Sequence, residues 1–230
     1  MFQIGIARPI FLLLLLLLLS YNFRSPTMSD AYLAAIATRR TNYAITAESS
    51  VSDEKLEAIV KHCVLHSPTP FNIQSSRAVL VIGAENTKLW KMISESYLKG
   101  LEGDHRATAE GKLAAFSGGY GTVLFFDDQA VIDDISVKIP AYVKHFPVWS
   151  KNAAGMLQHA VWTSLTLEGL AASLQHNGAY SDELVADILK TWGLPSTWTS
   201  SAMMPFGDPA KPPGEKQFGP IETRVKVFKA

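Results

Sequence analysis

Residues 118–128 read GGYGTVLFFDD, in which Val123-Leu124-Phe125-Phe126 is an apolar run between glycines and Asp127-Asp128. A short continuous apolar run of this kind is typical of a strand that is buried on both faces. A second run, Ala78–Ile82, is ended by Gly83. The two runs predict the centre of a sheet.

Helical patterns surround these strands. Ser52 is placed to cap a helix in which Leu56, Ile59, Val60, Cys63 and Val64 recur at helical spacing, and Pro68 stops it. Further helices are expected at Ser29–Arg40, Leu89–Leu101, Asn152–Leu174 and Asp182–Trp192, the last capped by Ser181, with a broken helix or lid at Ile132–Trp149. Further strands are expected at Thr197–Phe206 and Glu222–Lys229, with a rigid loop at Asp208–Pro220 between them. The pattern predicts an α+β fold, a mixed sheet sandwiched by helices.

Composition narrows the class of function. The chain has 21 basic and 21 acidic residues, so it lacks the positive charge that nucleic acid or a polybasic membrane contact would require. Its single cysteine excludes an internal disulfide and a cysteine-rich zinc framework, and favours a reducing compartment.

Residues 1–27 differ from the rest of the chain. Ile10–Leu19 is an unbroken apolar run between Arg8 and Arg24. It is shorter than the roughly 20 residues that a membrane-spanning helix needs, and fits a signal-peptide core better. We expect one domain over Met28–Ala230, preceded either by a real targeting leader or by an extension from a mis-assigned start.

Several motifs are better explained by ordinary structural roles than by a functional site. His62 and His66 are spaced as on a zinc helix, but no third ligand follows at a recognisable spacing, so ordinary histidines are favoured. Cys63 falls in the apolar stripe of its helix and is expected to be inert. The glycines of residues 118–121 precede a strand, whereas a glycine-rich phosphate-binding loop follows a strand and precedes a helix. A nucleophile elbow and a catalytic carboxylate pair are also missing from the sequence.

Two polar segments remain. Arg39-Arg40-Thr41 offers two guanidinium groups and a hydroxyl, which suit a phosphate monoester, although an arginine-rich helix end is the simpler interpretation. Ser67–Gln74 reads SPTPFNIQ, a proline-stiffened turn whose hydroxyl and amide groups could recognise the polar edge of a heterocycle.

Together the two segments resemble the nitroreductase family of flavoproteins, whose pattern is Arg-Arg/His-Ser/Thr followed by Pro-Ser-x-x-Asn-x-Gln. The similarity covers Met28–Ala230 and is greatest to the fungal branch called fatty acid repression mutant proteins. Further matching stretches are Gly119–Phe126, Leu167–His176 and Arg224–Phe228.

The resemblance implies an α+β homodimer that binds FMN at the subunit interface and uses NADH or NADPH to reduce nitroaromatics, quinones or related electrophiles. Carried over residue by residue, the implied FMN contacts are Arg39, Arg40, Thr41 and Lys216 for the phosphate and ribityl chain, Pro68, Thr69, Asn72 and Gln74 partly from the partner subunit, and Gln175 and His176 beside the isoalloxazine ring. Tyr43 and Phe218 replace basic residues that are common in the family, and Arg224 is expected to compensate.

This chemistry agrees with the missing acid–base pair. Flavin N5 carries the hydride, while the protein supplies orientation and positive or dipolar groups. NADH or NADPH reduces the flavin and departs before the acceptor occupies the same face, so ping-pong kinetics are expected. Tyr142, Phe146 and Trp149 are candidates for an aromatic wall that stacks planar acceptors. We expect a cytoplasmic or also nuclear protein, secreted only if the leader is real, with a role in oxidative stress. The alternatives are a flavin-binding regulatory or sensor protein linked to lipid metabolism, with little turnover, and a scaffold dimer without flavin.

Overall fold

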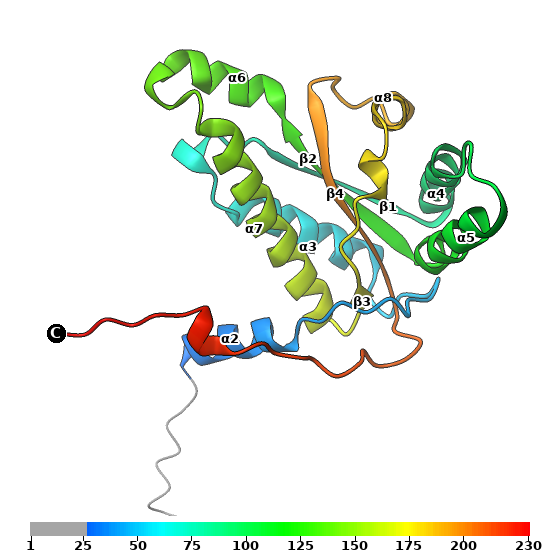
Figure 1. The fold of residues 1–230 in the computed structure, drawn as a ribbon, viewed down its shortest axis with the longest axis horizontal. Helices are drawn as coiled ribbons and strands as arrows, with labels where there is room; N and C mark the ends of the chain where they lie inside the picture. Colours follow the sequence, from blue (N-terminus) through cyan, green and yellow to red (C-terminus); the bar gives the residue numbers. More distant parts are fainter. Residues whose placement is uncertain (1–26) are drawn as a thin grey trace, which may run out of the picture. The chain divides into compact units, whose positions relative to one another are not determined.

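A four-stranded sheet forms the centre of the structure, a computed structural model that describes residues 27–230. Its strands are β1 (Ser76–Ile82), β2 (Gly121–Asp128), β3 (Ala171–Ala172) and β4 (Trp198–Gly207). They lie in the order β1-β2-β4-β3, and each pairing is antiparallel (Figure 1). The two central strands and the strand after residue 197 are confirmed, and so is the α+β class. Where the sequence suggested a mixed sheet, every pairing within residues 27–230 is antiparallel.

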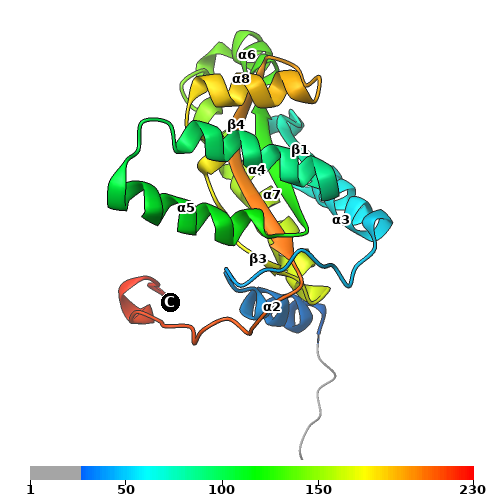
Figure 2. The same ribbon diagram turned by 90° about the vertical axis from the view of Figure 1, so that its right-hand side faces the viewer.

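Helices cover both faces of the sheet. The helices of the described residues are α2 (Met28–Thr38), α3 (Asp53–His66), α4 (Gly83–Tyr97), α5 (Gly103–Ser117), α6 (Gln129–Lys138), α7 (Phe146–Leu167) and α8 (Asp182–Thr191). Along β2, Val123 and Phe125 face α3 and α7, while Leu124 and Phe126 pack in the core that α4, α5 and α8 complete (Figure 2). Burial on both faces explains why the run around these residues is continuously apolar.

Local capping signals set several helix ends as expected. The hydroxyl oxygen of Ser52 accepts a hydrogen bond from the backbone nitrogen of Lys55, and that of Ser181 accepts one from Leu184. Gly193 follows α8 with φ +61°, the left-handed conformation that ends a helix without a steric penalty. The broken helix expected at 132–149 is also confirmed, because α6 ends at Lys138 before Pro140.

The helix expected at Leu89–Leu101 begins earlier, at Gly83, and ends at Tyr97, and α5 was not anticipated. The helix expected at Asn152–Leu174 is shifted as well, since α7 begins at Phe146 and ends at Leu167. Gly169, with φ +90°, turns the chain back. Ala171 and Ala172 then pair with β4, so the prediction of helix was wrong there.

The strand expected at Glu222–Lys229 is absent from the described residues. A short 3-10 turn spans Ile221–Thr223, and Val225 and Val227 are exposed. Alternation alone does not make a strand, because the backbone groups also need a neighbouring edge to pair with.

The chain before Ala37 forms a unit of its own. Its described part contains most of α2, which ends at Thr38. Arg39 and Arg40 therefore follow the helix, whereas the sequence predicted that they would lie in its last turn. The leader expected at 1–27 lies outside the described residues, apart from Thr27. Within residues 27–230, none of the helices combines the length and apolar composition that crossing a membrane requires.

Candidate functional site

The segment after α2 crosses the end of the sheet and joins the loop that follows β4. The backbone nitrogen of Asn42 donates to Ala172 O in β3 at 3.1 Å, and its side-chain Nδ2 donates to Lys211 O at 2.9 Å. Thr46 donates its backbone N–H to Asp208 O at 2.9 Å. The structure therefore brings together two loops that are more than 160 residues apart in the sequence.

Glycines allow this crossing to be tight. A Cβ atom on Gly207 would lie 2.0 Å from Thr46 O, and one on Gly119 would lie 2.9 Å from both Ile45 Cδ1 and Phe206 O. Close backbone packing is thus the role that the structure gives to Gly119 in the glycine-rich stretch before β2.

Two arginines project from the crossing segment. The guanidinium carbon of Arg39 lies 4.3 Å from the ring centre of Trp162 in α7, and its buried Nη1 has no hydrogen-bond partner within the described residues. Burial, and then the charge of Arg40, lower the pKa of Arg39, which nevertheless stays protonated because arginine does not lose its proton in proteins. Arg40 donates from Nη2 to Gly214 O. Neither arginine forms a salt bridge in residues 27–230.

The C-terminal loop contributes Lys216 to the same end of the molecule, because Arg40 already contacts Gly214 two residues earlier. Its Nζ lies 5.4 Å from the ring centre of Phe218. Arg224 instead donates to Gly219 O at 2.9 Å and to Pro220 O at 3.4 Å, so the structure ties it to its own turn. Thr41 is half-buried beside the arginines, and Tyr43 is exposed with its ring 6.2 Å from that of Phe116.

The second predicted segment forms a strained loop between α3 and β1. Phe71, Asn72 and Gln74 have φ values of 52°, 54° and 53°, which residues with a Cβ atom rarely adopt. Thr69 accepts hydrogen bonds at its carbonyl from Asn72 N (3.0 Å) and at Oγ1 from Gln74 N (2.9 Å). Arg77 donates to Gln74 O. A groove of about 680 Å³ runs beside this loop, with Thr69 and Gln74 in its wall, and Pro68 is exposed next to it.

Aromatic rings cluster against this loop. The Phe71 ring centre lies 5.8 Å from that of Tyr142, 5.7 Å from that of Phe146 and 6.3 Å from that of Trp149. The three proposed wall residues are thus brought together, but Phe146 is fully buried and supports the cluster from within, whereas Tyr142 is 41% exposed. Phe71 was missed in the sequence, where only its place inside the SPTPFNIQ motif marks it.

The segment with Arg39 and Arg40 and the strained loop between α3 and β1 lie at opposite ends of α7 (Figure 1). Trp162 contacts the arginine end and Trp149 contacts the strained loop, 13 positions earlier, which corresponds to about 20 Å along a helix. A single chain therefore keeps the two groups of residues apart.

Gln175 and His176 follow β3. The backbone of Gln175 makes an isolated bridge with Met203, through hydrogen bonds of 2.7 and 2.8 Å, which fixes this segment alongside β4. Gln175 is half-buried, and the His176 side chain is exposed.

Asp127, at the end of β2, is a buried carboxyl that sequence reasoning did not single out. The residue is 6% exposed, and its Oδ1 atom has no hydrogen-bond partner among the described residues. Burial raises the pKa of Asp127 to about 6, although the charges of Lys151 and Arg77 offset part of that rise. The signal was hidden because an acidic residue after an apolar run ordinarily marks the exposed end of a strand.

Other candidates do not form sites. The rings of His62 and His66 lie 4.4 Å apart on the exposed side of α3, and residues 27–230 contain no group of three potential metal ligands. Cys63 is buried as expected, which raises the pKa of its thiol.

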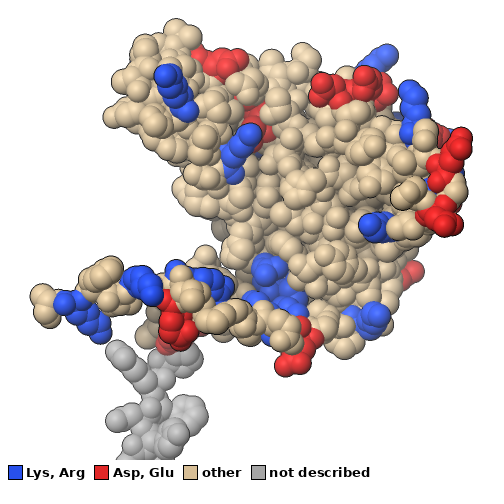
Figure 3. Space-filling view, viewed as in Figure 1, with Lys and Arg blue, Asp and Glu red and all other residues tan. Residues whose placement is uncertain are grey.

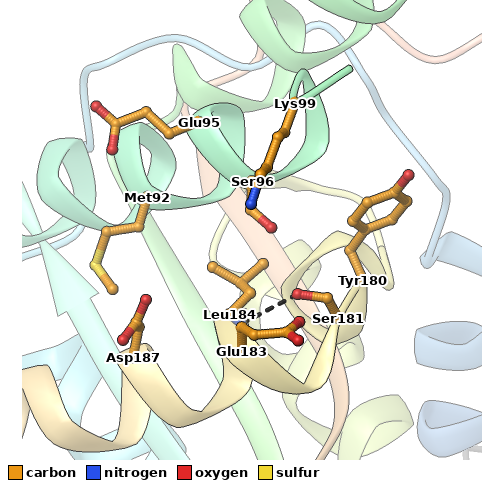
Figure 4. A pocket seen from close by; sticks show the side chains of 9 residues that line it. All are labelled: Met92, Glu95, Ser96, Lys99, Tyr180, Ser181, Glu183, Leu184 and Asp187. Atoms are coloured by element: carbon orange, nitrogen blue, oxygen red, sulfur yellow. Dashed lines mark hydrogen bonds between the residues drawn. The ribbon is translucent and has the colours of Figure 1, made fainter. Parts of the chain in front are cut away.

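A separate cavity of about 460 Å³ lies between α4 and α8 (Figure 4). Glu95, Glu183 and Asp187 outnumber Lys99 in its wall, which disfavours a phosphate group. Basic and acidic side chains are interspersed elsewhere on the face shown in Figure 3. The segment that carries Arg39 and Arg40 is therefore the better candidate for binding an anionic cofactor.

Comparison with known proteins connects this geometry to a family. A model of the nitroreductase family matches residues 36–208. The putative nitroreductase HBN1 and the nitroreductase FRM2 of Saccharomyces cerevisiae (strain ATCC 204508 / S288c) are 30% and 32% identical to the chain over 199 and 209 residues. These alignments cover 86% and 89% of the chain and 96% and 99% of the relatives.

A solved structure shares the fold. The nitroreductase CinD from Lactococcus lactis, in complex with nicotinic acid, is 35% identical with a TM-score of 0.76, and the match covers 86% of this chain and 100% of CinD. The resemblance found in the sequence, including the fungal branch, is confirmed by the family match and the yeast relatives. The chain belongs to the nitroreductase family of oxidoreductases.

Proposed function

We propose that the protein binds FMN and uses NADH or NADPH to reduce nitroaromatics, quinones or related electrophiles. The observation that carries this proposal is the pair Arg39 and Arg40, two neighbouring guanidinium groups that lack a carboxylate partner in the described residues. Two like charges held close together favour an anion, and planar guanidinium groups suit a phosphate in particular. Structures of two more distant members of the fold are described as containing FMN.

The residues at the arginine end fit the phosphate of FMN. The buried Nη1 atom of Arg39 has an unused hydrogen-bonding capacity, and the guanidinium carbon lies 4.3 Å from the ring centre of Trp162, a cation–π contact that helps to hold the group in place. Arg40 and Lys216 would add charge from the crossing segment and from the C-terminal loop. Bound FMN would supply hydride transfer through its flavin ring, so the protein needs no nucleophile of its own.

The residues of the strained loop fit the other end of the cofactor. Thr69, Asn72 and Gln74 offer a hydroxyl and two amides, which can pair with the donors and acceptors on the edge of the ring system. We assign Pro68 to the same surface. The exposed ring of Tyr142, together with Trp149, would stack planar acceptors beside it.

A homodimer would unite the two ends. Because the two segments lie about 20 Å apart along α7, a second copy in the opposite orientation would place its strained loop beside the arginines of the first. The outer side of α7 exposes Val148 and Met156, apolar surface that a partner would cover. The exposed Val225 and Val227 of the C-terminal segment also lack a strand partner within residues 27–230. We therefore place FMN at the subunit interface, with ping-pong kinetics in one shared site.

Steady-state turnover tests the proposal. Purified protein with FMN should oxidise NADH or NADPH when a quinone or a nitroaromatic compound is present, and a parallel-line pattern in double-reciprocal plots should reveal ping-pong kinetics. Stable FMN binding without such turnover would contradict the reductase function and favour the flavin-binding regulatory protein. Protein that fails to bind FMN would contradict the whole proposal.

A further inference from the structure

The backbone of the loop between α3 and β1 is unusual at Phe71. This residue has φ 52° and ψ 21°, the left-handed helical region, in which its Cβ atom is crowded. Asn72 and Gln74 share the left-handed conformation, but asparagine tolerates it much better than a bulky aromatic residue does. Such a conformation persists only where the surrounding contacts impose it.

The contacts that impose it come from the Phe71 ring. The ring stacks on Trp149 with an interplanar angle of 28°, and it meets the fully buried Phe146 edge-on at 63°. Both partners belong to α7, which is packed in the core, so the ring is attached to a rigid element. The ring also lies 5.8 Å from that of Tyr142, in the short turn before α7, and Phe71 nevertheless remains 57% exposed.

The same loop carries side chains with unused hydrogen-bonding capacity. The amide side chains of Asn72 and Gln74 make no hydrogen bond to other described residues, although the Asn72 and Gln74 backbone nitrogens are both bonded to Thr69. The loop thus holds its backbone in place and leaves two amides free to contact a ligand.

We propose that Phe71 is a positioning residue, whose ring holds the loop in the backbone conformation that presents Asn72 and Gln74 to FMN. This inference rests on the proposed function. The ring acts through the backbone of its own loop. The hydrogen bonds to Thr69 restrain residues 72 and 74, and the ring contacts offset the left-handed strain at residue 71, so without the ring that strain favours other conformations of the loop. The two amides then lose their fixed orientation.

Variants at this position separate an effect on the backbone from direct stacking on the cofactor. Phe71→Tyr keeps the ring. Phe71→Ala removes the ring and keeps the Cβ penalty, whereas Phe71→Gly removes both, because glycine adopts positive φ freely. FMN affinity is measured by quenching of flavin fluorescence in a titration of apoprotein, and the melting temperature of each variant checks its folding. Tyr180→Ala is the control, since Tyr180 is an aromatic residue of similar exposure, 53%, whose ring contacts Tyr97 away from this loop.

The inference predicts an order of affinities. Phe71→Tyr should bind FMN within about twofold of the wild-type protein, Phe71→Gly about threefold more weakly and Phe71→Ala about tenfold more weakly, because only alanine pays the backbone penalty. Trp149→Ala should also weaken binding, and combining it with Phe71→Ala should add little, because both remove the same contact. The control should match the wild-type protein.

Equal weakening by glycine and alanine would overturn the inference, since it would mean that the ring itself contacts the ligand. Unchanged affinity in the alanine variant, with wild-type protein binding FMN, would also overturn it while leaving the proposed function intact. Wild-type protein that does not bind FMN would overturn both.

Discussion

Replacing Asp127 by asparagine should stabilise the protein, and the gain should grow as the pH rises. Asp127 is 6% exposed, and burial raises the pKa of its carboxyl from 3.8 to about 6. Between these two values the unfolded chain releases the proton while the folded protein keeps it. Folding stability is therefore lost as the pH rises from about 4 to 6, and the loss is complete above that window. Asparagine has nearly the same shape and carries no charge at any of these pH values.

The size of the effect follows from the pKa difference for Asp127. Each pKa unit corresponds to 1.36 kcal/mol, so the rise from 3.8 to about 6 costs the wild-type protein about 3 kcal/mol at pH 8. At pH 5 about half of this cost is already present, because the unfolded carboxyl is ionised there and the folded one is not. The advantage of the variant should therefore grow by about 1.5 kcal/mol between pH 5 and pH 8, or about 3–6 °C in Tm for a chain of this size.

Urea denaturation of both proteins at pH 5 and pH 8 gives the required free energies of unfolding. Asp187→Asn is the control, because Asp187 is exposed on α8 and a surface substitution changes stability by less than about 0.5 kcal/mol. A constant difference between Asp127→Asn and wild type at the two pH values would refute the reasoning, since it would show that the buried carboxyl does not titrate in this window.

Three further results are expected. Gly207→Ala should destabilise the protein by about 2 kcal/mol or more, because the new Cβ atom would lie 2.0 Å from Thr46 O, whereas Gly214→Ala, with open space around it, should be nearly neutral in the same denaturation assay. The thiol of Cys63 should react with a disulfide reagent only when the protein unfolds, because it is buried and its pKa is raised; rapid reaction in native buffer would contradict this. Ser181→Ala should cost about 1 kcal/mol by removing the hydrogen bond at the start of α8, and a threonine variant that is equally unstable would point to another cause.

Much of the fold could be predicted because its signals are local. The caps of α3 and α8 depend on serines next to the helices they start, and the central strands are recognisable because both faces of the sheet are covered. The segment after Leu167 was not predictable in the same way. Its alanines and leucines suit a helix. They form a strand because Gly169, in a left-handed conformation, reverses the chain and brings Ala171 and Ala172 to the edge of β4 that β2 does not occupy.

In the candidate site, too, local motifs could be predicted from the sequence and long-range contacts could not. The motif around Arg39 and Arg40 could be found in the sequence, but its contact with Gly214 joins residues 174 positions apart. The strand expected at Glu222–Lys229 had the right alternation and lacked an edge to pair with. Asp127 was missed because its burial comes from tertiary packing, in which Lys151 of α7 comes near enough for its charge to act on the carboxyl, and no local pattern reveals this.

Discrimination between FMN and riboflavin tests the arginine site most directly, because the two ligands differ only in the phosphate. Wild-type protein should bind FMN about a hundredfold or more tightly than riboflavin, since charge-assisted hydrogen bonds contribute about 1.5–3 kcal/mol each. The double variant Arg39→Gln/Arg40→Gln should lose most of this preference and keep its affinity for riboflavin. Removal of two exposed charges elsewhere, in Lys112→Gln/Lys190→Gln, should leave the preference unchanged. If the arginine double variant still prefers FMN as strongly as wild type does, these two residues do not hold the phosphate.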